Sequence, residues 1–279
     1  MVASGQDIEE IVISFKELLP VEYYRSEPGQ IRQRNLGISK LDERTKLVAT
    51  MDDDVTYHEE AIIKMIEYWS SVKPDTGGVG FNMVNLPSNK HNWFLDLLGL
   101  SAPESGRVLK SGFNTTISNV DKDIQVEWLN GGATVWHQDL LMNNPHKELN
   151  IKWAVGEDLI FSYPLGKQYP LFICSDAEVE IEAVIIDDQP KEFYTERGKS
   201  IYIMGLYFIQ QNKDLSLIHF MINKFLYLTA LFVKGTLSIN TNKYYTAIGI
   251  IKAFFSSKSV LLGFESVDIL KTKLIDSLD

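Results

Sequence analysis

The chain has 279 residues, a hydrophobic share of 45% and a formal net charge of −10, from 27 Lys and Arg against 37 Asp and Glu. This composition supports a hydrophobic core and excludes wholesale disorder, and its acidity argues against a nucleic-acid-binding protein, which needs a basic face. The single cysteine, Cys174, excludes an internal disulfide framework and favours a reducing compartment.

Helical and β-prone segments alternate over the first 84 residues. Apolar residues at helical spacing predict helices over 8–19 and 29–40, and buried apolar runs predict strands at 46–50 and 78–84. A helix capped by Thr56 separates these two strands. Its predicted apolar face consists of Ala61, Ile62, Met65, Ile66 and Trp69. Such alternation is typical of a mostly parallel α/β sheet flanked by helices, in which ligands bind beyond the carboxyl ends of the strands.

The next hundred residues are less regular. Residues 85–123 are predicted to form a loop over a site, and 124–129 a further strand. Helices are predicted at 133–143 and 156–163, and two strands within 169–186. This part of the chain therefore extends the α/β pattern to about residue 190.

Three consecutive carboxylates, Asp52, Asp53 and Asp54, follow the strand predicted at 46–50. Like charges this close repel one another unless a cation or ligand compensates for them. Side chains two residues apart in extended chain point to the same side, so Asp52 and Asp54 can share one divalent ion. Oxygen ligands favour Mg²⁺ or Mn²⁺. The alternative is a solvated turn whose charge stabilises the N-terminus of the next helix.

Two other short motifs carry residues suited to chemistry. Glu157 and Asp158 begin a predicted helix, where a carboxylate can act as a general base or simply stabilise the helix dipole. Gly131 and Gly132 permit close approach of the backbone to a ligand, although Asn-Gly-Gly is also a common turn.

The ordered set QRNLGI at 33–38, TMDDDV at 50–55, WLNGGATVW at 128–136 and GEDLIFSYPLGKQY at 156–169 resembles the family 2 glycosyltransferases of the GT-A fold. The resemblance covers about residues 1–190. It implies a GT-A-like α/β catalytic domain over 1–190 that begins after the family's first strand, followed by a helical appendage over 191–279. It also implies a metal-dependent transfer of a sugar from a nucleotide-sugar donor, expected to be a UDP-sugar, to a saccharide or lipid-linked acceptor. A catalytically inactive binding module of the same fold is the alternative.

The resemblance also implies roles for individual residues. Asp52 would lie near the donor ribose, and Asp54, with Asp52 or Asp53, would hold the metal. Arg34 would lie near the nucleotide pocket. Asp158, with Glu157 beside it, would be the base in an inverting transfer. The donor sugar would be lined by Gly131, Gly132 and Ala133. No QxxRW-like motif is present, which favours addition of a single sugar.

The last third of the chain has the opposite charge. Residues 1–188 carry 16 basic and 30 acidic residues, whereas 189–279 carry 11 and 7, and no Asp or Glu occurs within 215–264. The apolar stretch 214–237 is predicted either to pack on the domain, to lie in the headgroup layer of an anionic membrane, or to span it. The stretch 243–262 repeats its lysine and aromatic composition and favours the headgroup layer. A cytoplasmic protein on the inner face of the membrane is expected. Arg197 and Lys199 are predicted in a loop that either reaches the donor diphosphate or is simply solvated.

Overall fold

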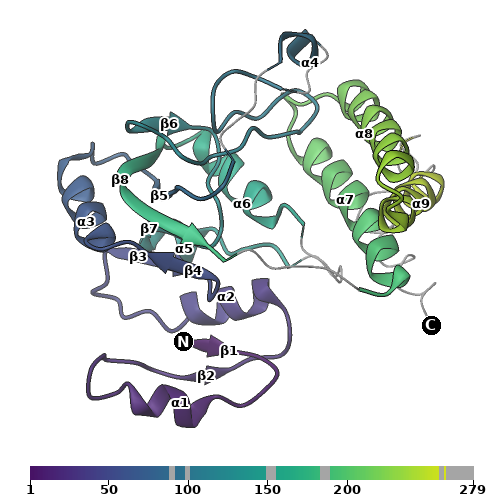
Figure 1. Cartoon of the computed structure of the whole chain (residues 1–279). Coiled ribbons are helices and arrows are strands. Elements are labelled where there is room, and N and C mark those ends of the chain that lie inside the picture. The colour runs from purple at the N-terminus through teal and green to yellow at the C-terminus, as the bar shows by residue number, and fades with distance from the viewer. Residues whose placement is uncertain (88–91, 98–100, 149–154, 183–188, 258–260, 262–279) are drawn as a thin grey trace. The chain divides into compact units, whose positions relative to one another are not determined.

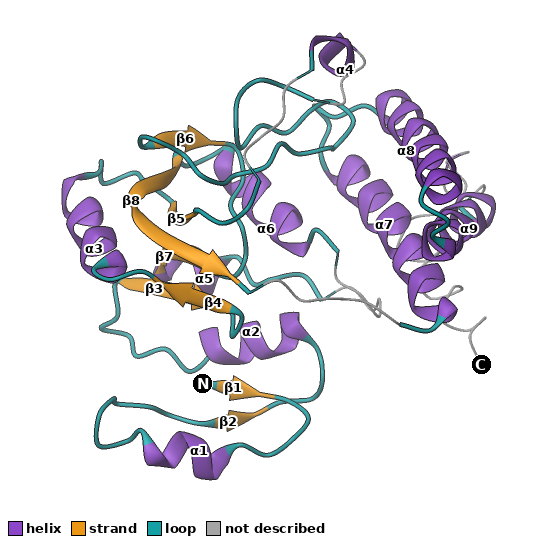
Figure 2. Cartoon of the chain, in the orientation of Figure 1, coloured by secondary structure: helices purple, strands orange, loops and turns teal. Residues whose placement is uncertain are grey.

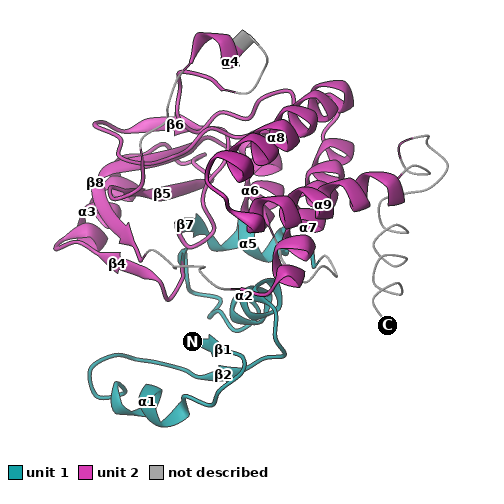
Figure 3. Cartoon of the chain, turned by 45° about the vertical axis from the view of Figure 1, so that its right-hand side comes forward, with its two compact units in different colours: residues 1–50, 135–149 teal, residues 51–134, 150–279 magenta. Residues whose placement is uncertain are grey.

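The computed structural model describes residues 1–87, 92–97, 101–148, 155–182, 189–257 and 261. The chain divides into two compact units (Figure 3). Unit 1 consists of Met1–Thr50 and Val135–Leu149, and unit 2 of Met51–Thr134 and Asn150–Asp279. The boundary expected at residue 190 does not coincide with this division, and it stays a prediction about domain organisation.

Helices and strands alternate along most of the described chain (Figures 1 and 2). The elements up to the acidic triplet are β1 (Val2–Ala3), α1 (Glu9–Ser14), β2 (Tyr24–Arg25), α2 (Gln30–Ile38) and β3 (Leu47–Met51). The next are β4 (Val55–Tyr57), α3 (Ala61–Ser71), β5 (Gly78–Met83), α4 (Trp93–Leu97), β6 (Ile124–Val126), β7 (Ala133–His137) and α5 (Gln138–Asn143). The last are α6 (Glu157–Gly166), β8 (Leu171–Ile181), α7 (Lys191–Gln211), α8 (Leu217–Leu237) and α9 (Thr241–Ser256).

Unit 1 is held together by polar contacts across long sequence distances. The strands β1 and β2 pair in parallel, with Val2 opposite Tyr24. On α2, the Asn35 side chain donates to the His146 carbonyl (2.8 Å) and accepts from the His146 N–H (3.0 Å). The Asn of the RN motif therefore fixes the segment after α5 to α2, because both hydrogen-bonding groups of its amide are used.

The sheet of unit 2 is organised around β8, which pairs in parallel with β5 and antiparallel with β4 and β6. Figures 1 and 3 show α3 and α6 on either side of β5 and β8. Val79, Leu171 and Ile173 are fully buried between these layers. The α/β class, with helices flanking a sheet and a helical C-terminal part, is confirmed, and the pairs around β8 are mixed rather than all parallel.

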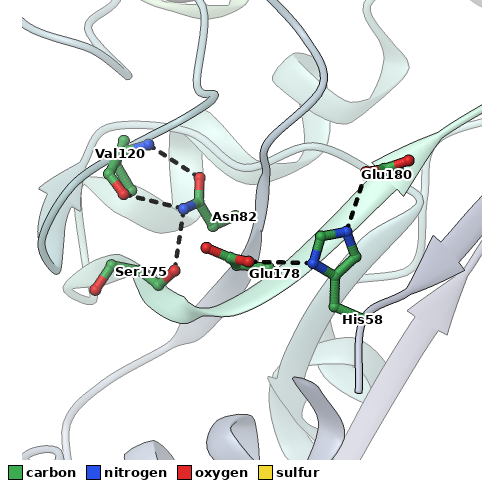
Figure 4. Close-up of polar contacts among 6 residues, drawn as sticks. All are labelled: His58, Asn82, Val120, Ser175, Glu178 and Glu180. Carbon is green, nitrogen blue, oxygen red and sulfur yellow. Dashed lines mark hydrogen bonds and ion pairs between the residues drawn. The ribbon is translucent and has the colours of Figure 1, made fainter. Parts of the chain in front are cut away.

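The pairing register of β5 and β8 shifts between Phe81 and Asn82, and the buried Asn82 side chain bonds the backbone groups at this point (Figure 4). Phe81 pairs with Cys174 but Asn82 with Glu178, so three residues of β8 lack a partner on β5. The Asn82 amide donates to the Val120 and Ser175 carbonyls, both at 3.0 Å, and accepts from the Val120 N–H at 3.0 Å. Residues 169–182 therefore contain one long irregular strand, where two strands were expected within 169–186. Residues 183–186 lie outside the described part.

The helix predicted at 133–143 is wrong in its first half. Residues 133–137 form β7, and only Gln138–Asn143 are helical. The run Ala-Thr-Val-Trp-His contains β-branched and aromatic residues that pack well in a sheet. A short apolar run does not by itself distinguish a strand from a buried helix.

The start and the face of α3 also differ from expectation. Thr56 lies in β4 opposite Glu180, and α3 begins at Ala61 after Glu60, whose φ is 65°. The helix buries Ala61 and Met65 but leaves Ile62 and Ile66 exposed. The apolar residues of α3 form a stripe wider than the surface of β8 that it covers.

The C-terminal helices pack at very short range. A Cβ atom at Gly198 of α7 would lie 2.1 Å from the Thr246 carbonyl oxygen of α9, and one at Gly249 of α9 would lie 2.0 Å from the Thr195 carbonyl oxygen of α7. Each glycine thus admits the backbone of the other helix. In the described part of the chain, α8 is long and apolar enough to cross a membrane, and little of its apolar stretch is buried inside the protein.

Candidate functional site

The acidic triplet forms the turn between β3 and β4. Asp52 and Asp54 are half-buried and Asp53 is exposed, as expected for alternating directions in extended chain. The Asp52 N–H donates to the Gly132 carbonyl (2.8 Å), and the Asp54 carbonyl accepts from the Glu182 N–H (2.7 Å). Backbone bonds on both sides therefore fix the direction of the two half-buried carboxylates.

The electrostatic environment of this turn is unfavourable to its own charges. Burial raises the pKa of Asp54, and the charges of Asp52, Asp53 and Glu182 raise it further. A divalent cation would offset this repulsion, and the pair Asp52 and Asp54 offers the oxygen ligands that Mg²⁺ and Mn²⁺ prefer. No group of three His, Cys, Asp or Glu residues in the described ranges has the arrangement of a complete metal site. Any metal held here would take its remaining ligands from water or a bound phosphate.

Tyr57 borders this turn and was not expected there. Burial and the Asp52 charge raise its pKa to about 12, so the phenol is neutral. Its hydroxyl group is buried and has no hydrogen-bond partner among the described residues. A buried donor without a partner is costly, and a bound ligand would satisfy it. Sequence reasoning missed Tyr57 because VTYH was interpreted as the start of a helix.

The Gly-Gly segment lies directly against the triplet. A Cβ atom at residue 132 would be 2.3 Å from Asp52 Oδ2, so a glycine is required for the carboxylate to lie there. Gly131 is partly exposed, whereas Gly132 and Ala133 are buried. The structure thus brings Asp52 and Gly132 together, although they are 80 residues apart in the chain.

Helix α6 runs along the same segment. A Cβ at Gly166 would lie 2.5 Å from the Glu127 carbonyl oxygen. One turn earlier in α6, the buried Ser162 hydroxyl accepts from the Leu129 N–H (2.9 Å) and donates to the Asp158 carbonyl (2.7 Å). Four residues of helix advance about 6 Å, and two residues of extended chain advance about 6.6 Å. The helix and the segment therefore advance together as far as the contact between Ser162 and Leu129, and Asp158 lies one turn before Ser162 on the same side of α6.

Of the two acids at the start of α6, only Asp158 is on the side of Ser162. Residues four apart share a helix face, whereas Glu157 is rotated by about 100° from Asp158. Gly156 precedes them with φ 78°, a conformation that glycine adopts readily, and it turns the chain into the helix. Ser162 is a positioning residue that the sequence did not reveal, because its role depends on tertiary pairing with Leu129.

The other end of α6 is anchored to the segment between α7 and α8. Tyr163 donates to Asp214 Oδ2 (2.6 Å), and Lys167 forms an ion pair with Asp214 and donates to Asn212 Oδ1 (3.1 Å). Although burial alone would raise the pKa of Asp214, the hydrogen bonds from Lys167 and Tyr163 lower it below its ordinary value. The Tyr163 and Phe208 rings also meet edge to face, with centroids 5.4 Å apart.

The remaining predicted site residues lie elsewhere. Arg34 is on α2 of unit 1, where burial, and to a smaller extent the Arg34 charge, lower the pKa of His146 to about 3. Its expected role at a nucleotide pocket stays a prediction. The loop expected around Arg197 and Lys199 is wrong, because both residues lie within α7. There Lys199 is half-buried and paired with Glu196 (2.7 Å).

A second group of charges lies on the β4–β8 edge of the sheet (Figure 4). His58 Nδ1 is 3.1 Å from Glu178, and its Nε2 is 3.1 Å from Glu180. The hydrogen bond with Glu180 raises the pKa of His58, and the one with Glu178 adds to this effect. The three side chains are largely exposed, and we interpret them as a surface cluster that pins residue 58 to β8.

Comparison with known proteins gives limited similarity. No protein-family model and no curated protein matches the chain. Among solved structures, A197 from STIV is similar with 14% identity and a TM-score of 0.34, over 64% of this chain and 90% of that chain. The mannosyltransferase PcManGT from Pyrobaculum calidifontis, in complex with GDP-Man and Mn²⁺, is similar with 12% identity and a TM-score of 0.47, over 97% of this chain and 76% of that chain. At these values neither likeness assigns an activity to this chain.

Proposed function

We propose that the protein is a glycosyltransferase that moves a sugar from a nucleotide-sugar donor to a hydroxyl group of a saccharide or lipid-linked acceptor. One observation carries the proposal: the Gly-Gly segment lies against Asp52 of the acidic turn, and Leu129, just before that segment, is hydrogen-bonded to Ser162 of α6. The motifs that resemble family 2 glycosyltransferases in sequence order thus include three that converge in space. Such convergence is expected of a catalytic site and not of unrelated turns.

In this proposal each group has a distinct task. Asp52 lies against Gly132 and would contact the donor ribose, while Asp54, with Asp52 or Asp53, would hold Mg²⁺ or Mn²⁺. When bound, the metal would supply positive charge that stabilises the departing diphosphate. The neutral Tyr57 hydroxyl would donate a hydrogen bond to the ligand.

The acceptor side of the reaction would rest on α6. Asp158 would take the proton from the acceptor hydroxyl as that oxygen attacks the sugar carbon and the bond to the diphosphate breaks. One base and one displacement invert the configuration at that carbon. Gly131, Gly132 and Ala133 would line the donor sugar, and a UDP-sugar is the donor that the resemblance favours.

The test is nucleotide release with Mn²⁺ across a panel of nucleotide sugars. Asp54→Ala and Asp158→Ala are each expected to lower the rate by about 100-fold or more, since metal and base act on the transition state. Asp75→Ala is the matched control, because Asp75 is an exposed carboxylate in the turn before β5, and it should leave the rate unchanged.

Calorimetric titration with UDP and Mn²⁺ separates binding from turnover. Asp54→Ala should abolish the Mn²⁺-dependent part of UDP binding, whereas Asp158→Ala should retain it. If the wild type binds a nucleotide sugar but releases no nucleotide above background, the inactive binding module is correct instead. Equal release by the wild type and both variants would refute the proposed enzyme.

A further inference from the structure

The outward side of α8 is an apolar surface that the described protein does not cover. Ile218, Ile222, Phe225, Phe232 and Val233 recur at helical spacing on this side, and we call them the α8 face. Ile218 is 71% exposed and Phe225 69%. The opposite side of α8 is the one that packs on α7 and α9, and it buries Phe220, Asn223, Leu231 and Gly235. Core packing therefore explains only one side of this helix.

The two threonines on the α8 face do not require water. The Thr229 hydroxyl donates to the Phe225 carbonyl (3.0 Å), and the Thr236 hydroxyl donates to the Phe232 carbonyl (2.9 Å). Each hydroxyl is thereby satisfied within the helix itself. The face can enter an apolar medium without leaving a side-chain donor unpaired.

The cationic residue at the middle of α8 points away from this face. Lys224 is about 140° around the helix from the centre of the α8 face, and its ammonium lies over the Phe220 ring, 5.1 Å from the centroid. Its Cε is 3.6 Å from the position of a Cβ at Gly205 on α7. Lys224 therefore packs on the protein, and the cost of placing its charge in hydrocarbon does not arise for a helix that lies flat.

The charges within the sequence of α8 and α9 are all positive. The stretch 215–264 contains five lysines and no Asp or Glu. Lys234 and Lys252 are exposed, and Lys243 donates to Ser238 Oγ (2.9 Å) rather than to a carboxylate. A second copy of the chain on this face would bring two sets of lysines together, which is unfavourable. Anionic headgroups have the complementary charge.

We propose that the α8 face docks on an anionic lipid bilayer, with α8 lying in the headgroup layer and the positive charge of α8 and α9 attracting the anionic surface at longer range. The apolar area would supply most of the binding, and the lysines would supply its dependence on anionic lipid and on salt. The proposal is independent of glycosyl transfer, because it concerns only where the protein resides.

The experiment is flotation of the full chain with vesicles of phosphatidylcholine alone or mixed equally with phosphatidylglycerol. The wild type should float with the mixed vesicles and much less with phosphatidylcholine. Ile218→Ser with Ile222→Ser should lower the partition coefficient about tenfold or more at any salt concentration. The reason is that two apolar side chains that the bilayer would bury are lost. The matched control is Ile62→Ser with Ile66→Ser on α3, an equally spaced and equally exposed pair, which should bind as the wild type does.

A second double variant tests the electrostatic contribution to membrane binding. Lys234→Gln with Lys252→Gln should weaken binding to the mixed vesicles about threefold and flatten its salt dependence, because these charges act on the surface at longer range. Circular dichroism and light scattering verify the fold and mass of every variant. Unchanged flotation of the Ile218 and Ile222 variant would overturn the proposal. So would a wild-type dimer that this variant dissociates without any vesicle binding, because a second copy would then cover the face.

Discussion

The acidic turn and the α8 face are both unfavourable for the protein on its own, for opposite reasons. At the turn, half-buried carboxylates crowd together and raise the pKa of Asp54. At the α8 face, apolar side chains that water does not solvate well are exposed on a helix whose charged residues are all lysines. A stable fold alone would select neither feature. The comparison teaches that opposite kinds of unfavourable feature lead to proposals of opposite partners: a cation at the turn, and an apolar, anionic surface at the helix.

The largest expected effect tests the site half of this comparison. Asp158→Asn should lower the rate of nucleotide release by about 10²–10⁴-fold, because an amide does not accept the acceptor proton. Glu157→Gln should lower it by less than about tenfold, since Glu157 lies on a different side of α6 from Asp158 and Ser162. Single-turnover kinetics with a saturating donor measure both. Equal losses, or a larger loss in Glu157→Gln, would remove Asp158 from the proposed role.

A smaller effect tests whether the C-terminal helices are a firm support for the α8 face. Gly198→Ala should lower the free energy of unfolding by about 1–3 kcal/mol, because its Cβ meets the Thr246 carbonyl and forces α7 and α9 apart. Gly37→Ala in α2 is the matched control, as its Cβ would be 3.5 Å from Val2 Cγ2, an ordinary contact. It should raise the stability by about 0.5–1 kcal/mol.

Urea unfolding of both glycine variants measures this difference. Wild-type stability in Gly198→Ala would mean that α7 and α9 do not need their close approach. The α8 face would then rest on a more deformable support than the structure indicates.

The smallest effect concerns a cluster that belongs to neither region. Glu180 and Glu178 raise the pKa of His58 in the folded state, so the charged imidazole stabilises the fold. This contribution is fully present below about pH 6.5, the unfolded pKa, and is lost as pH rises through the higher folded pKa. The melting temperature of the wild type should exceed that of His58→Gln at pH 5.5 and approach it at pH 9. A difference that grows with pH would have the wrong sign.

Local patterns predicted much of the sheet. The apolar runs at 46–50 and 78–84 became β3 and β5, although only β5 is buried as expected, and the acids at 157–158 begin α6. Periodicity failed where two structures share one pattern, as at Val135 and Trp136 of β7. It also failed for Ile62 and Ile66, because a helical stripe does not reveal how wide a partner surface the fold provides.

The sequence predicted the acids and glycines of the candidate site from their residue types, but it did not predict the residues that surround and position them. The acids and glycines stand out in sequence, whereas Tyr57 and Ser162 do not. Their importance comes from interactions in the folded chain. The charge of Asp52 acts on Tyr57, and the Leu129 N–H donates to Ser162. Such contacts join segments about 5 and 33 residues apart, and only the folded chain defines them.

The Asp214 junction has a mechanical consequence. Asp214 lies three residues before α8 and bonds Tyr163 and Lys167 of α6, the helix whose first turn carries Asp158. The hydrogen bond and the ion pair of Asp214 therefore connect the start of α8 directly to α6. A displacement of α8 is expected to move α6 with it. With α8 docked as proposed, the tilt of α6 relative to the bilayer is set by the same contact. The contacts of Asp214 with α6 would then also fix the direction from which an acceptor anchored in that bilayer approaches α6.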